Sequence, residues 1–206
     1  VVIIGSGAGG GTMAYELTRN GVPCVLIEAG RHFSVDDWEN DEWAAFGHMA
    51  WLDMRTTSGS YRITKDFPNL PAWICKTVGG TTTHWAGASL RFQEHEFKAK
   101  TTYGDIQGAN LLDWPLTLAD LEPYYEKVER EQGYSGRAGN IKGEFAPGTN
   151  PFEPPRNRDY PMPPVPQGPG DIPWVAATER LGMHPFRQPL ALNSTEYRGR
   201  SACLNC

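Results

Sequence analysis

A glycine-rich turn between two apolar runs constrains the fold of this chain more than any other feature of its sequence. The turn, GSGAGG at residues 5–10, follows the apolar run at residues 1–4, which predicts a buried strand. Residues 12–19 then repeat apolar side chains at helical spacing, and a second apolar run occupies residues 24–28. A strand, a crossover helix and a strand in so short a stretch predict a βαβ unit with parallel strands over residues 1–30. We therefore expect an α/β fold with a Rossmann-like parallel sheet.

The glycines of this turn have the spacing of a dinucleotide-binding motif. Gly5 permits the tight turn, Gly7 lets the backbone approach a diphosphate, and Gly10 allows the helix to pack closely on the strand. The diphosphate would lie at the helix N-terminus, where backbone N–H groups and the helix dipole favour anions. The spacing thus predicts nucleotide binding at the start of the helix.

An acidic residue ends the second apolar run, where the adenosine half of a dinucleotide would lie. Glu28 is placed to accept the ribose hydroxyls, and its charge would repel the 2′-phosphate of NADP. The alternative is that the glycines only form a turn and Glu28 is a solvated strand end. The candidate contacts of this first motif are Gly5, Ser6, Gly7, Ala8, Gly9, Gly10, Glu28 and Ala29.

A second glycine motif, TVGGTTTHW, begins at residue 77, and further blocks follow it along the chain. The blocks are VIIGSGAGGG at 2–11, LIEAG at 26–30, VGGTTTHWAGASLRF at 78–92, DWPLTLADLEPYYEKVE at 113–129 and YPMPPVP at 160–166. Together they resemble the glucose–methanol–choline (GMC) oxidoreductases, a family of FAD-dependent flavoproteins that oxidise alcohols. Within the family, the chain is most similar to bacterial gluconate, fructose, sorbitol and glucose dehydrogenase flavoprotein subunits, and its Thr-His-Trp segment resembles pyranose oxidases.

The resemblance implies FAD as the cofactor, with residues 78–92 as a second, flavin-contacting motif. Backbone N–H and hydroxyl groups of such a motif could face the flavin ring where negative charge gathers on reduction. In pyranose oxidases the histidine that matches His84 is covalently bonded to the flavin; the alternative is that His84 only hydrogen-bonds near the ring. The candidate contacts of the second motif are Val78, Gly79, Gly80, Thr81, Thr82, His84 and Trp85.

The resemblance also implies a reaction: hydride passes from a CH–OH carbon of a sugar, polyol or sugar acid to flavin N5 while a histidine base removes the hydroxyl proton. That base matches no position here, so we expect the catalytic residues beyond residue 206. The electrons would pass to an acceptor other than O₂. The alternatives are an oxidase that reduces O₂, as pyranose oxidases do, and a non-catalytic nucleotide-binding module.

A cysteine pair, Cys203-x-x-Cys206, closes the sequence. In related dehydrogenases a cysteine-rich stretch after an element such as Arg198-Gly199-Arg200 holds an iron–sulfur cluster that passes electrons to a cytochrome. The rival interpretations are a disulfide, half of a zinc site or two ordinary thiols. By the same analogy, we expect a cytochrome or other acceptor, a small subunit, and a periplasmic or membrane-associated location.

Composition excludes two classes of partner. The chain has 206 residues and a formal net charge of −5 without a block of like charges, which argues against nucleic-acid binding. No apolar run is long enough to span a membrane. Because residue 1 lies inside an apolar run and the last residue belongs to a cysteine pair, we expect a fragment of the FAD-binding domain, without the substrate domain and the C-terminal catalytic segment.

Two long insertions and one clear helix complete the prediction. Residues 31–74 are rich in tryptophan and turns, without a regular period, and residues 151–170 form a proline-rich excursion for which Tyr160, Met162 and Trp174 are the expected apolar anchors. The helix begins near Thr117 and ends at Gly133. Its internal proline, Pro123, is tolerable in the first turn if Asp120, rather than Thr117, is the N-cap. 

Overall fold

The computed structural model describes residues 1–37, 41 and 77–203. The chain divides into two compact units, Val1–Trp85 and Ala86–Cys206, which are described separately below. Most of the irregular stretch expected at residues 31–74 lies outside the described residues.

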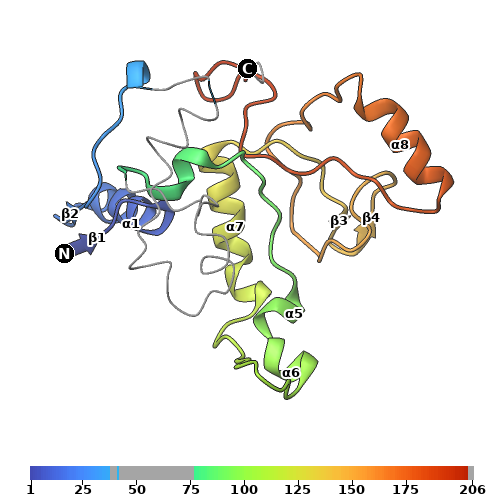
Figure 1. The fold of residues 1–206 in the computed structure, drawn as a ribbon, viewed down its shortest axis with the longest axis horizontal. Helices are drawn as coiled ribbons and strands as arrows, with labels where there is room; N and C mark the ends of the chain where they lie inside the picture. The colour runs from blue at the N-terminus through green and yellow to red at the C-terminus, as the bar shows by residue number, and fades with distance from the viewer. Residues whose placement is uncertain (38–40, 42–76, 204–206) are drawn as a thin grey trace. The chain divides into compact units, whose positions relative to one another are not determined.

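The first unit contains the βαβ arrangement that the sequence predicts (Figure 1). Strand β1 spans Val2–Ile4, helix α1 Ala8–Arg19 and strand β2 Val25–Ile27. The two strands pair in parallel, with Val2 opposite Val25 and Ile4 opposite Ile27. A short 3₁₀ helix, η1, follows at Val35–Asp37, and a second, η2, at Gly80–His84. The parallel pairing confirms a Rossmann-like fold.

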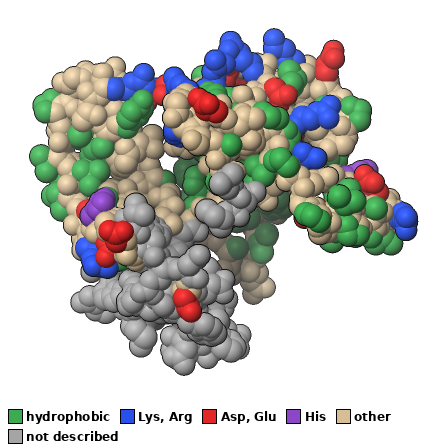
Figure 2. Space-filling model, turned by 90° about the horizontal axis from the view of Figure 1, so that it is seen from above, with side chains coloured by type: hydrophobic (Ala, Val, Ile, Leu, Met, Phe, Trp, Pro, Cys, Tyr) green, Lys and Arg blue, Asp and Glu red, His purple; other side chains and the backbone are tan. Residues whose placement is uncertain are grey.

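The strands of this sheet are far more exposed than the sequence predicts. Only Ile3 of β1 is buried, at 8% exposure, whereas Val2, Ile4, Val25 and Ile27 are 54–87% exposed. The prediction of a buried first strand is therefore wrong for most of its side chains, because the described residues provide no further strand beside this two-stranded sheet. Parallel sheets are normally covered on both faces, so this apolar surface requires cover from another element. Exposed hydrophobic side chains are visible on the face drawn in Figure 2.

The second unit is built from short elements around one longer helix (Figure 1). Its elements are α5 at Glu94–Phe97, α6 at Ala99–Tyr103, α7 at Leu118–Gln132, the antiparallel strands β3 at Asn140–Ile141 and β4 at Glu144–Phe145, and α8 at Asp171–Arg180.

The structure decides which residue caps the N-terminus of α7. The N-cap is Thr117, not Asp120, and the two residues form a reciprocal capping box: the Asp120 N–H donates to Thr117 Oγ1 (3.3 Å), and the Thr117 N–H donates to Asp120 Oδ2 (2.8 Å). Pro123 consequently lies inside the helix, where it cannot donate to the carbonyl of Ala119. The capping box satisfies N–H groups of the first turn and offsets that lost bond. At the other end, the expected stop at Gly133 is confirmed, with φ of +77°.

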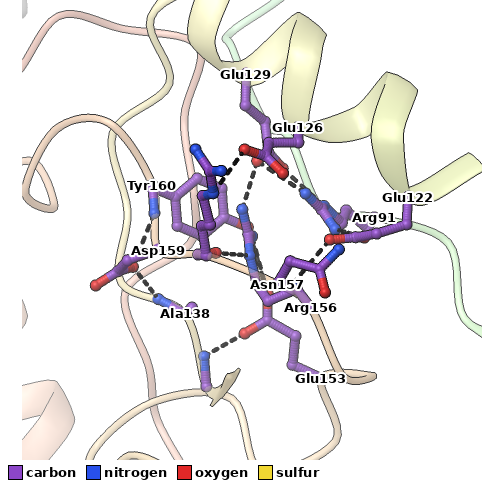
Figure 3. A network of polar contacts seen from close by, with 12 residues as sticks. Arg91, Glu122, Glu126, Glu129, Ala138, Glu153, Arg156, Asn157, Asp159 and Tyr160 are labelled. Carbon is purple, nitrogen blue, oxygen red and sulfur yellow. Dashed lines mark hydrogen bonds and ion pairs between the residues drawn. The ribbon is translucent and has the colours of Figure 1, made fainter. Parts of the chain in front are cut away.

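Buried charged side chains join α7 to distant segments of the second unit (Figure 3). The Glu129 carboxylate accepts two hydrogen bonds from Arg91, at 2.7 Å from Nε and 2.9 Å from Nη2, and a further one from Arg156. Glu122 and Glu153 complete the ion pairs of the two arginines. Arg156 is only 2% exposed and Glu129 only 3%. Three chain segments far apart in sequence are thereby fixed to one another.

The proline-rich excursion is attached to this centre. Tyr160 and Met162, two of its expected apolar anchors, are both buried, whereas the third, Trp174, is 62% exposed, so that expectation is wrong. The guanidinium carbon of Arg156 lies 3.9 Å from the centre of the Tyr160 ring, a cation–π contact. The backbone of Met162 forms a parallel bridge with Ser135, accepting from the Gly136 N–H and donating to the Tyr134 carbonyl. The segment is therefore held by its middle.

Replacing Glu129 tests the importance of the buried ion pairs. Glu129→Ala leaves the facing edges of two buried guanidinium groups without their shared carboxylate, so we expect the free energy of unfolding to fall by about 3 kcal/mol. Glu126→Ala on the same helix is the matched control, because the Glu126–Arg158 pair, 3.1 Å apart, is largely exposed on the arginine side; a loss below about 1 kcal/mol is expected there. Equal losses in urea unfolding would contradict the account.

Candidate functional site

The turn between β1 and α1 is closely packed at Gly10. A Cβ built on Gly10 would lie 1.9 Å from the Gly5 carbonyl oxygen, so only glycine fits there. The N-cap of α1 is Gly7; no side chain caps the helix, and its first turn contains no acidic residue. Ala8 and Gly9 begin the helix. The N-terminal end of α1 therefore remains suited to an anion.

Glu28 lies directly after β2 and faces this turn. One oxygen of its carboxylate, Oε2, accepts the Ser6 N–H (2.8 Å) and the Ser6 hydroxyl (2.6 Å). The other, Oε1, accepts the Gly30 N–H (2.8 Å). The hydroxyl and N–H of Ser6, followed by the Gly30 N–H, lower the pKa of Glu28 to about 2. Glu28 is consequently ionised at physiological pH and acts only as a hydrogen-bond acceptor.

The second glycine motif is attached to the end of the βαβ unit. Thr77, which is 1% exposed, forms an isolated parallel bridge with Arg31. The Val78 N–H and the Thr77 hydroxyl both donate to the Arg31 carbonyl, at 3.0 and 2.9 Å. This bridge continues the parallel pairing beyond β2 and directs the chain into the Gly79–Gly80 turn.

The backbones of the two motifs meet at their glycines. A Cβ built on Gly80 would lie 3.1 Å from the Gly7 Cα, and Gly80 has a φ of +59°, which disfavours other residues. The Gly79 N–H donates to the Ser6 hydroxyl oxygen at 2.9 Å. The structure therefore brings Ser6, Gly7, Glu28, Gly79 and Gly80 into one small region.

The remaining candidate residues surround this junction less closely. Gly79 is the N-cap of η2, and His84 is the last residue of that helix. The hydroxyl of Thr82 donates to the Gly79 carbonyl, so this threonine stabilises its own turn. The side chains of Val78, Thr81, Thr82 and Trp85 are exposed, as is that of Ala29.

Sequence reasoning missed the residues that hold the two motifs together. Gly30 and Arg31 contribute only backbone N–H and carbonyl groups, which any residue type could supply, so the sequence does not reveal their role. Thr77 carried a weak signal, since a β-branched residue directly before a Gly-Gly turn suits an extended segment. The hydroxyl of Ser6 was assigned to the site, but its bond to Gly79 spans 73 residues and could not be read from a motif.

The segment before the cysteine pair is fixed on the end of α7. Arg198 and Gly199, with φ of +51° and +76°, form a tight turn between Tyr197 and Arg200. The Tyr197 hydroxyl donates to the Arg130 carbonyl (2.9 Å), and Arg200 Nη2 donates to the Gln132 carbonyl (2.7 Å). These bonds satisfy carbonyl groups of the last helical turn.

The described part of the chain contains no complete ligand set for the iron–sulfur cluster that the resemblance implies. Cys203 is exposed, and its N–H donates to the Asn193 carbonyl (2.8 Å), while Cys206 lies outside the described residues. Within residues 1–37, 41 and 77–203, no group of three or more His, Cys, Asp or Glu side chains could hold a metal ion. An iron–sulfur cluster needs three or four thiolates, and the described residues do not bring that many together, so the cluster stays a prediction.

Substituting the glycines of the first turn tests its close packing. Gly10→Ala places a methyl group against the Gly5 carbonyl, so we expect the free energy of unfolding to fall by about 3 kcal/mol. Gly9→Ala is the matched control: it also lies in α1, but its Cβ would meet nothing within 4 Å. Urea unfolding of both variants compares them, and a Gly10→Ala protein as stable as Gly9→Ala would show that the turn is not closely packed.

Comparison with known proteins indicates the family to which the chain belongs. A sequence profile described as an NAD(P)-binding Rossmann-like domain matches residues 3–52. The fructose dehydrogenase large subunit of Gluconobacter japonicus is 34% identical over 221 residues, covering 98% of this chain and 38% of that protein. Paromamine 6′-oxidase of Streptomyces fradiae is 32% identical over 212 residues, covering 98% and 32% respectively. The gluconate 2-dehydrogenase flavoprotein of Pantoea cypripedii is 28% identical over 218 residues, covering 95% and 35%.

The chain thus spans about a third of the length of these relatives, and it aligns with them over nearly all of its own length. The parallel βαβ unit, the closely packed glycine turn and the acidic end of β2 are features of a dinucleotide-binding fold. With these relatives, they place the chain in the glucose–methanol–choline oxidoreductase family, as its N-terminal FAD-binding region.

Proposed function

We propose that the protein is an FAD-dependent dehydrogenase that oxidises a CH–OH group of a sugar, polyol or sugar acid and passes the electrons to an acceptor other than O₂. When bound, the flavin supplies the chemistry, since it accepts a hydride from the alcohol carbon. The observation that carries the proposal is the junction of the two glycine motifs, because it joins an anion-binding helix end to a second backbone turn through Ser6.

The described residues fit the two halves of the cofactor. The uncapped N-terminus of α1 suits the diphosphate, and the ionised Glu28 at the end of β2 suits the ribose hydroxyls. Residues 78–82 with His84 and Trp85 form the flavin side, at the turn that the Gly79 N–H and the Ser6 hydroxyl hold against the first motif. FAD is held without a covalent bond, so acid precipitation of the protein releases it.

The names of the relatives support the choice of substrate and acceptor. Two of the three are named as dehydrogenases, of fructose and of gluconate, and both names denote compounds rich in hydroxyl groups. One name specifies a flavoprotein and the other a large subunit, which supports a flavin cofactor and a smaller partner. The histidine base that removes the hydroxyl proton belongs to a segment outside this chain, and the chain itself binds and orients the cofactor.

The acceptor is a cytochrome or similar carrier, at the membrane or in the periplasm. No helix in the described part of the chain is long and apolar enough to cross a bilayer.

A second candidate is an oxidase that passes the electrons to O₂. One relative, paromamine 6′-oxidase, favours it, since it is named as an oxidase and is nearly as similar to this chain as the fructose dehydrogenase subunit. The residues described here do not distinguish the two acceptors.

The experiment is to purify the protein from its full reading frame and to record its absorbance before and after anaerobic addition of sugars, polyols and sugar acids. We expect an oxidised-flavin spectrum that one of these compounds bleaches. Turnover should then proceed with a dye acceptor and be slow with O₂. Rapid turnover with O₂ alone would favour the oxidase. A colourless protein that takes up no added FAD would overturn the proposal.

A further inference from the structure

The hydroxyl group of Ser6 bonds to both glycine motifs at once. It donates to Glu28 Oε2 (2.6 Å), 22 residues away, and it accepts from the Gly79 N–H (2.9 Å), 73 residues away. The first partner lies at the end of β2, on the adenosine side of the site. The second is the N-cap of η2, on the flavin side. One side chain therefore connects parts of the site that are remote in sequence.

The direction of these two bonds is fixed by the chemistry of the partners. The Glu28 carboxylate is ionised and can only accept, and the Gly79 N–H can only donate. A hydroxyl group, with one donor and two acceptor positions, satisfies both at the same time. Alanine and glycine supply neither function, whereas threonine supplies both.

Loss of this hydroxyl would act on the two partners unequally. Glu28 would keep the backbone N–H groups of residue 6 (2.8 Å) and Gly30 (2.8 Å), so its carboxylate would remain in place. Gly79 would lose the acceptor that the structure gives its N–H. The close approach of Gly80 to Gly7, where a Cβ would lie 3.1 Å from the Gly7 Cα, depends on the same placement of the second turn.

We propose that Ser6 is a positioning residue that fixes the flavin-side turn at Gly79 against the adenosine-side turn, so that its hydroxyl governs how tightly the flavin half of FAD is held. The proposal rests on the proposed function, since it assumes that FAD spans both motifs. It concerns the relative placement of two backbone segments and requires no contact between the Ser6 side chain and the cofactor.

Comparing the affinities for FAD and for ADP distinguishes this positioning role from a general weakening of the first turn. FAD contacts both motifs, whereas ADP is confined to the first. For Ser6→Ala in the protein stripped of cofactor, we expect FAD to bind about tenfold more weakly, which corresponds to the loss of about one hydrogen bond. The affinity for ADP, measured by competition with FAD, should change less than about twofold, because Glu28 and α1 keep their positions. Quenching of flavin fluorescence gives the dissociation constants.

Two further variants complete the experiment. Ser6→Thr retains the hydroxyl and should restore FAD affinity to within about threefold of the wild type. Ser34→Ala is the matched control, because Ser34 also donates its N–H (2.7 Å) and hydroxyl (2.9 Å) to one carboxylate oxygen, that of Asp37, in a segment outside both motifs. It should bind FAD like the wild type.

The outcomes separate the inference from the proposed function. If Ser6→Ala weakens FAD and ADP equally, or if it weakens neither, Ser6 does not position the flavin-side turn and the inference is overturned. Failure of Ser6→Thr to restore binding would overturn it as well. If the wild-type protein binds ADP but not FAD, the proposed function itself fails, and the inference fails with it.

Discussion

The structure of the first unit depends on the contact between two turns at their glycine residues. Gly10 lies against Gly5 so closely that a methyl group would overlap a carbonyl oxygen, and Gly80, at a positive φ, lies against Gly7 with a Cβ position 3.1 Å from the Gly7 Cα. Such packing is available only to glycine, and it places the N-terminus of α1, the end of β2 and the start of η2 side by side. Ser6 and Glu28 then fix the turns with directed hydrogen bonds, so that the geometry does not depend on a large apolar core.

The two units differ in how they are stabilised. In the first, the strands expose most of their apolar side chains, and the described residues leave the sheet open. This agrees with a chain that spans about a third of the length of its relatives, because a parallel sheet requires cover on both faces. In the second, buried ion pairs between Arg91, Glu129 and Arg156 join helix α7 to distant segments. Removal of Glu129 would leave each of the two buried arginines with one remaining carboxylate partner, Glu122 or Glu153.

The sequence predicts the local elements well because their signals are local. The strand–turn–helix–strand pattern, the helix ending at Gly133 and the anchors Tyr160 and Met162 all follow from spacing or residue type. Pro123 would lie in the first turn of α7 only with Asp120 as the N-cap; this condition is not met, because the capping box forms at Thr117. The burial of β1 was overestimated because strand patterns assume neighbours that a single motif cannot supply.

What the sequence could not predict is the long-range pairing. Arg91 and Glu129 are 38 residues apart, and Ser6 and Gly79 are 73 apart, so no periodicity connects them. For the candidate site, the motifs identified the two turns, and the structure added that these turns meet. The proposed roles of individual residues in binding FAD follow from the contact between the two turns, together with the chemistry of an ionised carboxylate and an uncapped helix N-terminus.

The most direct measurement of the central claim is hydrogen–deuterium exchange of the protein with and without FAD. If the two glycine motifs form one cofactor site, FAD should slow amide exchange in both peptides that contain them, residues 5–11 and 77–85, and in the peptide around Glu28. Protection confined to the first motif, with exchange at residues 77–85 unchanged by FAD, would contradict the account.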